Sequence, residues 1–231
     1  SPRVTGVLTC ALPILLLRLT QHSVTAADYV QMSVRLVRLK RRKSRMNIMI
    51  VGVGGQGTLL ASRILGKVAI KEGYDVKVSE VHGMSQRGGS VVTYVKYGDK
   101  VYSPIIDRGE ADLILAFEML EAMRALPYLK KGGKMIANTQ KMNPMPVITG
   151  AMEYPENIEE KLSAKINLQA VDALSLAEKA GTIKAVNVVL IGLLAKSMDV
   201  DKNVWIDVIK ETVPEKFLDV NIKAFELGYE L

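Results

Sequence analysis

The sequence predicts an α/β fold in which a mostly parallel, twisted sheet is flanked by helices and the C-terminal end is helical. Residues 48–53 form a short run that is apolar on both faces, as in a central parallel strand. A glycine cluster overlaps its end, and residues 58–72 then place their apolar side chains on one helical face. Strand and helix patterns alternate from there onward, which is typical of a layered α/β domain.

The next two strands follow directly along the chain. Gly73 ends the first helix, and residues 75–81 alternate apolar and polar side chains as a strand does. Residues 90–97 are rich in Val, Thr and Tyr and predict another strand. Gly98-Asp99 is a hairpin signal, so we expect residues 100–102 to form the return strand.

The later elements are read from the same patterns. Residues 143–154, which contain Pro144 and Pro146, are expected to be irregular or to lie at an edge. Asp172 is a candidate helix cap. The remaining predicted elements are strands at 111–117, 134–138 and 166–170 and helices from 118 to about 126 and at 158–164, 186–198, 205–212 and 215–227.

Charge and cysteine content exclude several classes of function. The net charge of +7 suggests nucleic-acid binding, but residues 1–45 hold nine Lys or Arg and one acid, whereas residues 46–231 hold 22 basic and 23 acidic residues. The folded part is therefore nearly neutral, and we expect no nucleic-acid partner. The sequence contains no run of eighteen apolar residues, so it predicts no membrane-spanning helix. Cys10 is the only cysteine, so the chain cannot ligate a zinc ion or an iron–sulfur cluster through cysteines by itself, and we expect no metal site.

Residues 1–45 are expected to be non-native or disordered, and residues 46–231 to form a single domain. The stretch VTGVLTCALPI, residues 4–14, resembles the translation of a sequencing-adapter oligonucleotide, so our hypothesis is that Met46 is the natural start and that the head is read-through of non-coding DNA. A secretory signal with its apolar core at 7–17, and a membrane-surface helix around 28–43, remain the alternatives.

The glycine cluster predicts a phosphate-approaching turn. Gly52, Gly54 and Gly57 have the spacing G-x-G-x-x-G between a strand and a helix, which also describes a dinucleotide-binding, Rossmann-like turn. Glu80 ends the second strand, where an acid that binds the ribose of NAD would lie. A free-standing NAD-dependent dehydrogenase is therefore one hypothesis. The other interpretation is that these glycines serve only strand-to-helix packing.

A second motif, SEVHGMSQRGGSV at residues 79–91, follows the second strand. Loops at the carboxyl ends of parallel strands carry the ligand contacts of α/β sheets. His82 could act as a general acid or base, or simply bond to the backbone. Arg87 offers a planar fork for a carboxylate or a phosphate, or for a salt bridge to another subunit. Gln56 and Gln86 could point their amides at one ligand or brace the two loops.

The two motifs together resemble the gamma subunit, or gamma domain, of the 2-oxoacid:ferredoxin oxidoreductases. The resemblance rests on VGVGGQGTLLASRILGKVAIKEGYDV (51–76) and SEVHGMSQRGGSVVTYVKYG (79–98), and it covers about residues 46–231. The variant HGMSQRGG (82–89) is most similar to the beta subunit of indolepyruvate:ferredoxin oxidoreductase. Under this resemblance the candidate cofactor-binding residues are Gly52, Gly54, Gly55, Gln56, Gly57, Gln86, Arg87, Gly88 and Gly89, with His82 and Arg87 as candidate catalytic residues.

The resemblance implies a subunit of a heteromeric cytoplasmic enzyme. Its large partner subunit would carry thiamine diphosphate and the iron–sulfur clusters. The complex would decarboxylate an aryl pyruvate oxidatively, with coenzyme A accepting the acyl group and ferredoxin the electrons. This chain alone would bind none of these cofactors. The residues agree on one point, since 46–231 contain no cysteine to hold a cluster.

Overall fold

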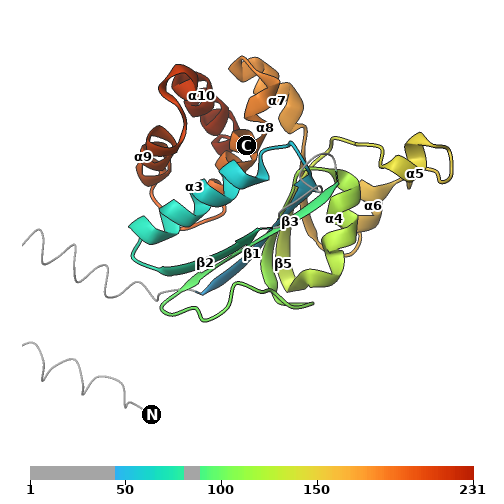
Figure 1. The fold of residues 1–231 in the computed structure, drawn as a ribbon, viewed down its shortest axis with the longest axis horizontal. Coiled ribbons are helices and arrows are strands. Elements are labelled where there is room, and N and C mark those ends of the chain that lie inside the picture. Colours follow the sequence, from blue (N-terminus) through green and yellow to red (C-terminus); the bar gives the residue numbers. More distant parts are fainter. Residues whose placement is uncertain (1–44, 81–88) are drawn as a thin grey trace, which may run out of the picture. The chain divides into compact units, whose positions relative to one another are not determined.

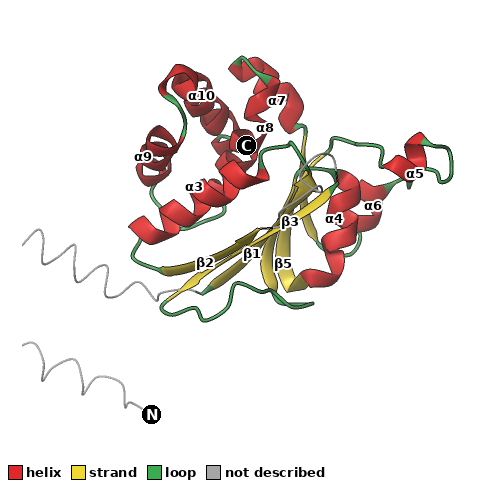
Figure 2. Cartoon of the chain, viewed as in Figure 1, coloured by secondary structure: helices red, strands yellow, loops and turns green. Residues whose placement is uncertain are grey.

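The computed structural model describes residues 45–80 and 89–231, and its centre is a six-stranded mixed sheet (Figures 1 and 2). The spatial order of the strands is β2-β3-β1-β4-β5-β6. Only β3 runs against its neighbours, pairing antiparallel with both β1 and β2, whereas β1, β4, β5 and β6 pair in parallel. The strands are β1 Met46–Val53, β2 Asp75–Glu80, β3 Ser90–Gly98, β4 Ala111–Ala116, β5 Leu129–Asn138 and β6 Asn167–Val171.

The expected hairpin at Gly98-Asp99 is wrong. Residues 100–102 form no strand, because β1 and β2 already occupy the two edges of β3. The chain after β3 is instead held by a side chain, since the Val101 N–H donates to Asp75 Oδ2 at 2.8 Å. A short turn signal predicts where a strand ends, but it carries no information about which distant strands fill the sheet.

Helices cover both faces of the sheet, as the predicted fold class requires (Figure 1). One face carries α3 and the C-terminal helices, and the other carries α4 and α6. Tight 3₁₀ turns at Leu126–Tyr128, Ile183–Ala185 and Glu215–Phe217 connect these elements. The helices are α3 Thr58–Lys71, α4 Met119–Ala125, α5 Met145–Ile148, α6 Ile158–Ser163, α7 Ala173–Ala180, α8 Val186–Lys196, α9 Lys202–Thr212 and α10 Leu218–Tyr229.

The local signals for helix ends are confirmed. The Asp172 carboxylate accepts the Ser175 N–H at 3.0 Å and caps α7. Pro127 lies in the 3₁₀ turn that follows α4, where its missing N–H costs no helical hydrogen bond. The irregular segment 143–154 contains one short helix, α5, which begins after Pro144.

The larger core lies between the sheet and the C-terminal helices. Helix α8 is apolar around nearly its whole circumference, as is typical of a helix buried on all sides, and ten of its eleven residues are buried. It crosses α10 very closely: a Cβ on Gly192 would lie 2.1 Å from the Phe225 carbonyl oxygen, and one on Gly228 would lie 2.0 Å from the Val189 carbonyl oxygen. Glycines therefore set the distance between these two helices.

No helix in the described part of the chain, residues 45–80 and 89–231, has the length and apolar character needed to cross a membrane.

Candidate functional site

The glycine loop connects β1 to α3 at the end of the sheet where the parallel strands have their carboxyl ends. We call this end of the sheet the glycine-loop edge. Gly55 and Gly57 have φ values of 101° and 85°, which side-chain-bearing residues adopt only with strain. The loop uses its own amides: the Gly54 N–H donates to Gly89 O at 2.9 Å and the Gln56 N–H to Val53 O at 3.2 Å. These two N–H groups are therefore not free to hold a phosphate.

The Gln56 side chain lies over Gly52. Its Oε1 accepts the Val53 N–H at 2.7 Å, and its Nε2 donates to the Phe117 carbonyl at 3.2 Å. A Cβ on Gly52 would lie 2.8 Å from Gln56 Oε1 and 3.0 Å from Phe117 Cβ. Gly52 thus makes room for a protein side chain, and Gln56 braces the carboxyl ends of β1 and β4.

Gly57 makes room for a second polar side chain, Asn187. A Cβ on Gly57 would lie 2.5 Å from Asn187 Nδ2, and that amide donates to the Gly57 carbonyl at 3.4 Å. Sequence reasoning missed Asn187, although a single polar residue within the apolar run of α8 was a visible signal. The contact fastens the start of α3 to the start of α8.

The second motif meets the first at the same edge. Because β3 is antiparallel, its first residue Ser90 pairs with Val53, the last residue of β1. The hydrogen bond from Gly54 to Gly89 closes this junction. The other residues of that motif that were singled out, His82, Gln86, Arg87 and Gly88, lie outside the described residues.

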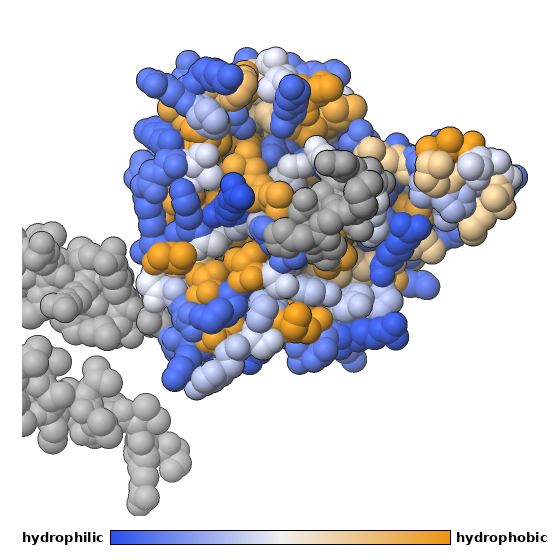
Figure 3. Space-filling model, in the orientation of Figure 1, coloured by the Kyte–Doolittle hydropathy of each residue, from blue (hydrophilic) through white to orange (hydrophobic). Residues whose placement is uncertain are grey.

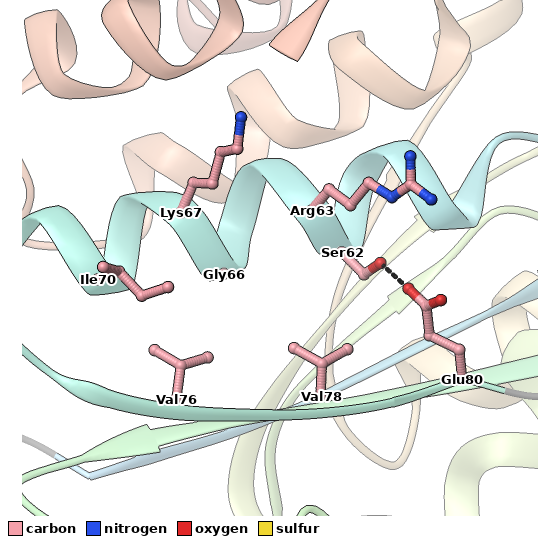
Figure 4. A pocket seen from close by; sticks show the side chains of 8 residues that line it. All are labelled: Ser62, Arg63, Gly66, Lys67, Ile70, Val76, Val78 and Glu80. Atoms are coloured by element: carbon pink, nitrogen blue, oxygen red, sulfur yellow. Dashed lines mark hydrogen bonds between the residues drawn. The ribbon is translucent and has the colours of Figure 1, made fainter. Parts of the chain in front are cut away.

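Glu80 lies apart from the glycine loop. Strand β3 separates β2 from β1, so the end of β2 is one strand further away than in a dinucleotide-binding turn. Its carboxylate accepts a hydrogen bond from the Ser62 hydroxyl at 2.6 Å, at one end of a groove of about 400 Å³ between α3 and β2 (Figure 4). The dehydrogenase hypothesis therefore has no support in the position of Glu80.

A cavity of about 520 Å³ lies beside the glycine loop. Its lining is mainly apolar and includes one cation, Lys184, at the turn before α8. Such a cavity can take an apolar group together with a negatively charged one. The lining residues are Gly54, Gly55, Gln56, Gly57, Gln140, Met142, Leu174, Ile183, Lys184 and Val186.

Two buried carboxylates lie just after β4, at the start of α4, and sequence reasoning did not find them. Glu118 is 1% exposed and Glu121 is 4% exposed. Glu118 accepts hydrogen bonds from the Tyr154 hydroxyl and from the Met142 N–H. Burial, together with the hydrogen bond to Glu118, raises the pKa of the Tyr154 hydroxyl above its ordinary value.

The second of these carboxylates, Glu121, accepts hydrogen bonds from the Arg124 guanidinium and from the Ser90 hydroxyl. Arg124 Nη1 donates to its Oε1 at 2.5 Å, and the Ser90 hydroxyl donates to its Oε2 at 2.6 Å. Among residues 45–80 and 89–231, no group of three or more His, Cys, Asp or Glu is arranged to hold a metal ion.

Residues 47–231 match the protein family described as Pyruvate ferredoxin/flavodoxin oxidoreductase. Over 190 residues the chain is 46% identical to a protein named Indolepyruvate oxidoreductase subunit IorB from Thermococcus kodakarensis, and the match covers 79% of this chain and 93% of that protein. The subunit of the same name from Pyrococcus horikoshii is 47% identical over 188 residues, again covering 79% and 93%.

Solved structures have the same fold. The gamma subunit of a keto/oxoacid ferredoxin oxidoreductase from Geobacter sulfurreducens matches with a TM-score of 0.60 and 25% identity, over 80% of this chain and 96% of that chain. A 2-oxoglutarate:ferredoxin oxidoreductase from Magnetococcus marinus matches with a TM-score of 0.63 and 18% identity, over 81% of this chain but only 31% of that longer chain.

Proposed function

Because the chain belongs to the pyruvate ferredoxin/flavodoxin oxidoreductase family, we propose that it is the cluster-free subunit of a heteromeric indolepyruvate:ferredoxin oxidoreductase. The observation that carries the proposal is the 46–47% identity to IorB subunits over nearly their whole length. The cysteine content supports it. Residues 46–231 contain no cysteine to bind an iron–sulfur cluster, and electron transfer to ferredoxin requires such a cluster, so another subunit must hold it.

The proposed reaction belongs to the complex. An aryl 2-oxoacid loses carbon dioxide, its acyl group forms a thioester with the sulfur of coenzyme A as the thiol proton is released, and the two electrons set free pass through the clusters to ferredoxin. Thiamine diphosphate supplies carbanion stabilisation for this chemistry when bound. We assign thiamine diphosphate and the clusters to a large partner subunit, and we propose a cytoplasmic location for the complex.

For this chain we propose a binding role at the glycine-loop edge. The residues proposed to face the large subunit and its cofactors are those of the two motifs, with Arg87 as the candidate anion-binding group. The apolar cavity beside the loop fits the pantetheine portion of coenzyme A, and Lys184 would hold a phosphate. In the complex, Lys184→Glu is expected to raise the KM for coenzyme A while leaving the KM for the 2-oxoacid unchanged.

Co-expression with the large subunit tests the proposal. The chain should co-purify with an iron–sulfur protein and the complex should oxidise indole-3-pyruvate, whereas the isolated chain should be inactive. Activity of this chain without a partner would contradict the assignment. Arg87→Ala separates the roles: lost turnover with normal assembly indicates ligand binding, and lost assembly indicates an interface residue.

We also propose that residues 46–231 are the functional domain. A chain that begins at Met46 should then assemble and support turnover as the full chain does. Mass spectrometry of the native protein supplies the second test, because a peptide from residues 10–30 would contradict the read-through hypothesis.

A further inference from the structure

The segment between β5 and α6 projects from the body of the domain and carries α5 (Figure 1). We call residues 143–153 the arm. Three of its side chains are large, apolar and exposed: Met145 by 66%, Ile148 by 64% and Met152 by 66%. The arm contains only one charged residue, Glu153. Figure 3 shows apolar surface on this projection.

The arm is fastened at both ends by a single carboxylate. Oε1 of Glu118 accepts the Met142 N–H at 3.1 Å, just before the arm, and the Tyr154 hydroxyl, just after it. The other oxygen of Glu118 accepts the Glu121 N–H at 2.9 Å and so caps α4. The bonds from both ends of the arm thus converge on the buried start of α4. An arm fixed at both ends has less backbone conformational entropy to lose on binding than a free loop would have.

A cavity of about 520 Å³ lies between the arm and the body of the domain. Met145 and Ile148 line it and are still largely exposed, so they form its open lip. Val53 and Ser90, from the edge that carries the glycine loop, also line it, together with three charged residues, Glu118, Glu121 and Arg124. The cavity therefore joins the arm and the glycine-loop edge into one continuous surface.

We propose that the arm and this cavity receive an apolar segment of the large catalytic subunit. The inference rests on the proposed function, which turns the glycine-loop edge toward that subunit. In the longer 2-oxoglutarate:ferredoxin oxidoreductase chain the same fold makes up only 31% of the polypeptide, so there it is joined covalently to further domains. The flexible methionine at the lip, Met145, suits a partner surface, because its side chain adapts to what it covers.

The test measures assembly of the full chain with the large subunit. The double substitution Met145→Asp/Ile148→Asp puts two charges on the lip, and it should weaken binding on the order of tenfold or more. Ile148→Ala is the milder second variant and should weaken binding to a smaller degree. Phe217→Asp is the matched control, since Phe217 is 49% exposed but lies at the start of α10, and it should bind like the original chain.

Each outcome separates this inference from the proposed function. If the original chain does not bind the large subunit, the proposed function fails and the inference fails with it. If the original chain binds and both lip variants bind equally well, with unchanged thermal unfolding, only the inference is overturned. It is also overturned if the isolated chain forms a dimer that the double substitution Met145→Asp/Ile148→Asp abolishes, because the occupant would then be a second copy.

Discussion

Gln56 occupies the space above Gly52, the first glycine of the loop, which in a dinucleotide-binding motif permits the tight turn. The side chain bonds to Val53 at the end of β1 and to Phe117 at the end of β4. A loop that resembles a ligand cradle in sequence is therefore a brace between two strands. This role also explains why the loop needs a glycine at position 52.

Gln56→Ala should lower the free energy of unfolding by about 1–2 kcal/mol, because the Val53 N–H loses its partner and the Phe117 carbonyl keeps only the hydrogen bond from Asn138. Urea denaturation measures this change. Gln169→Ala is a matched control, since among the described residues the Gln169 side chain makes no hydrogen bond, and it should change stability little. Equal effects of the two substitutions would contradict the bracing role of Gln56.

Tyr154 gives a prediction about pH. Its pKa is raised in the folded protein, so the folded state holds the hydroxyl proton more tightly than the unfolded state, in which the pKa is about 10. The resulting stabilisation is complete below about pH 10 and is lost as the pH rises through the folded-state pKa. The free energy of unfolding should therefore fall more steeply above about pH 10 in the original chain than in Tyr154→Phe. Parallel curves for the two proteins would show that Tyr154 contributes no such dependence.

The residues of this edge were only partly predictable. The glycines and Gln56 stand close together in the sequence, and their spacing identified the loop. Glu118 and Tyr154 are 36 positions apart, and Gly57 and Asn187 are 130 apart. No local pattern announces a hydrogen bond across such separations, because it depends on how the strands and helices pack.

At the scale of elements, the crossing of α8 and α10 is the most demanding contact. Gly192→Ala would place a methyl group 2.1 Å from the Phe225 carbonyl oxygen, so the helices must move apart. We expect a loss of about 3 kcal/mol in the free energy of unfolding, measured by chemical denaturation.

Gly66→Ala on α3 is the control for that prediction. The nearest atoms to its new methyl group would be Val78 Cγ2 at 3.7 Å and Val76 Cγ1 at 3.9 Å, which are ordinary contacts. Alanine also favours a helix over glycine, so this variant should be about 0.5–1 kcal/mol more stable. A destabilised Gly66→Ala would mean that helical glycines in this protein are required for reasons other than close approach.

Most of the helices and strands could be predicted from the sequence, but the pairing of the strands in the sheet could not. The glycine loop, the helix 58–71 and the cap at Asp172 depend on neighbouring residues, and all three are present. The expected return strand at 100–102 failed because the partners of β3 are β1, about forty residues upstream, and β2. Strand order is a property of the whole sheet.

At the scale of the whole molecule, the chain should not bind a nicotinamide cofactor. Titration of the isolated chain with NADH, followed by fluorescence, should show no saturable binding in the micromolar range. The reason is structural, since Gln56 fills the turn and β3 separates Glu80 from it. Micromolar binding would revive the dehydrogenase hypothesis that the sequence had left open.

The placement of β3 also has a consequence for synthesis on the ribosome. Strand β1 has β3 and β4 as its neighbours, so residues 46–80 alone contain two strands that do not pair with each other. A nascent chain of that length has no sheet to form, and the first hairpin-like pairing must await residues 90–98. Folding of this end is therefore expected to begin only when the antiparallel strand emerges and joins the two.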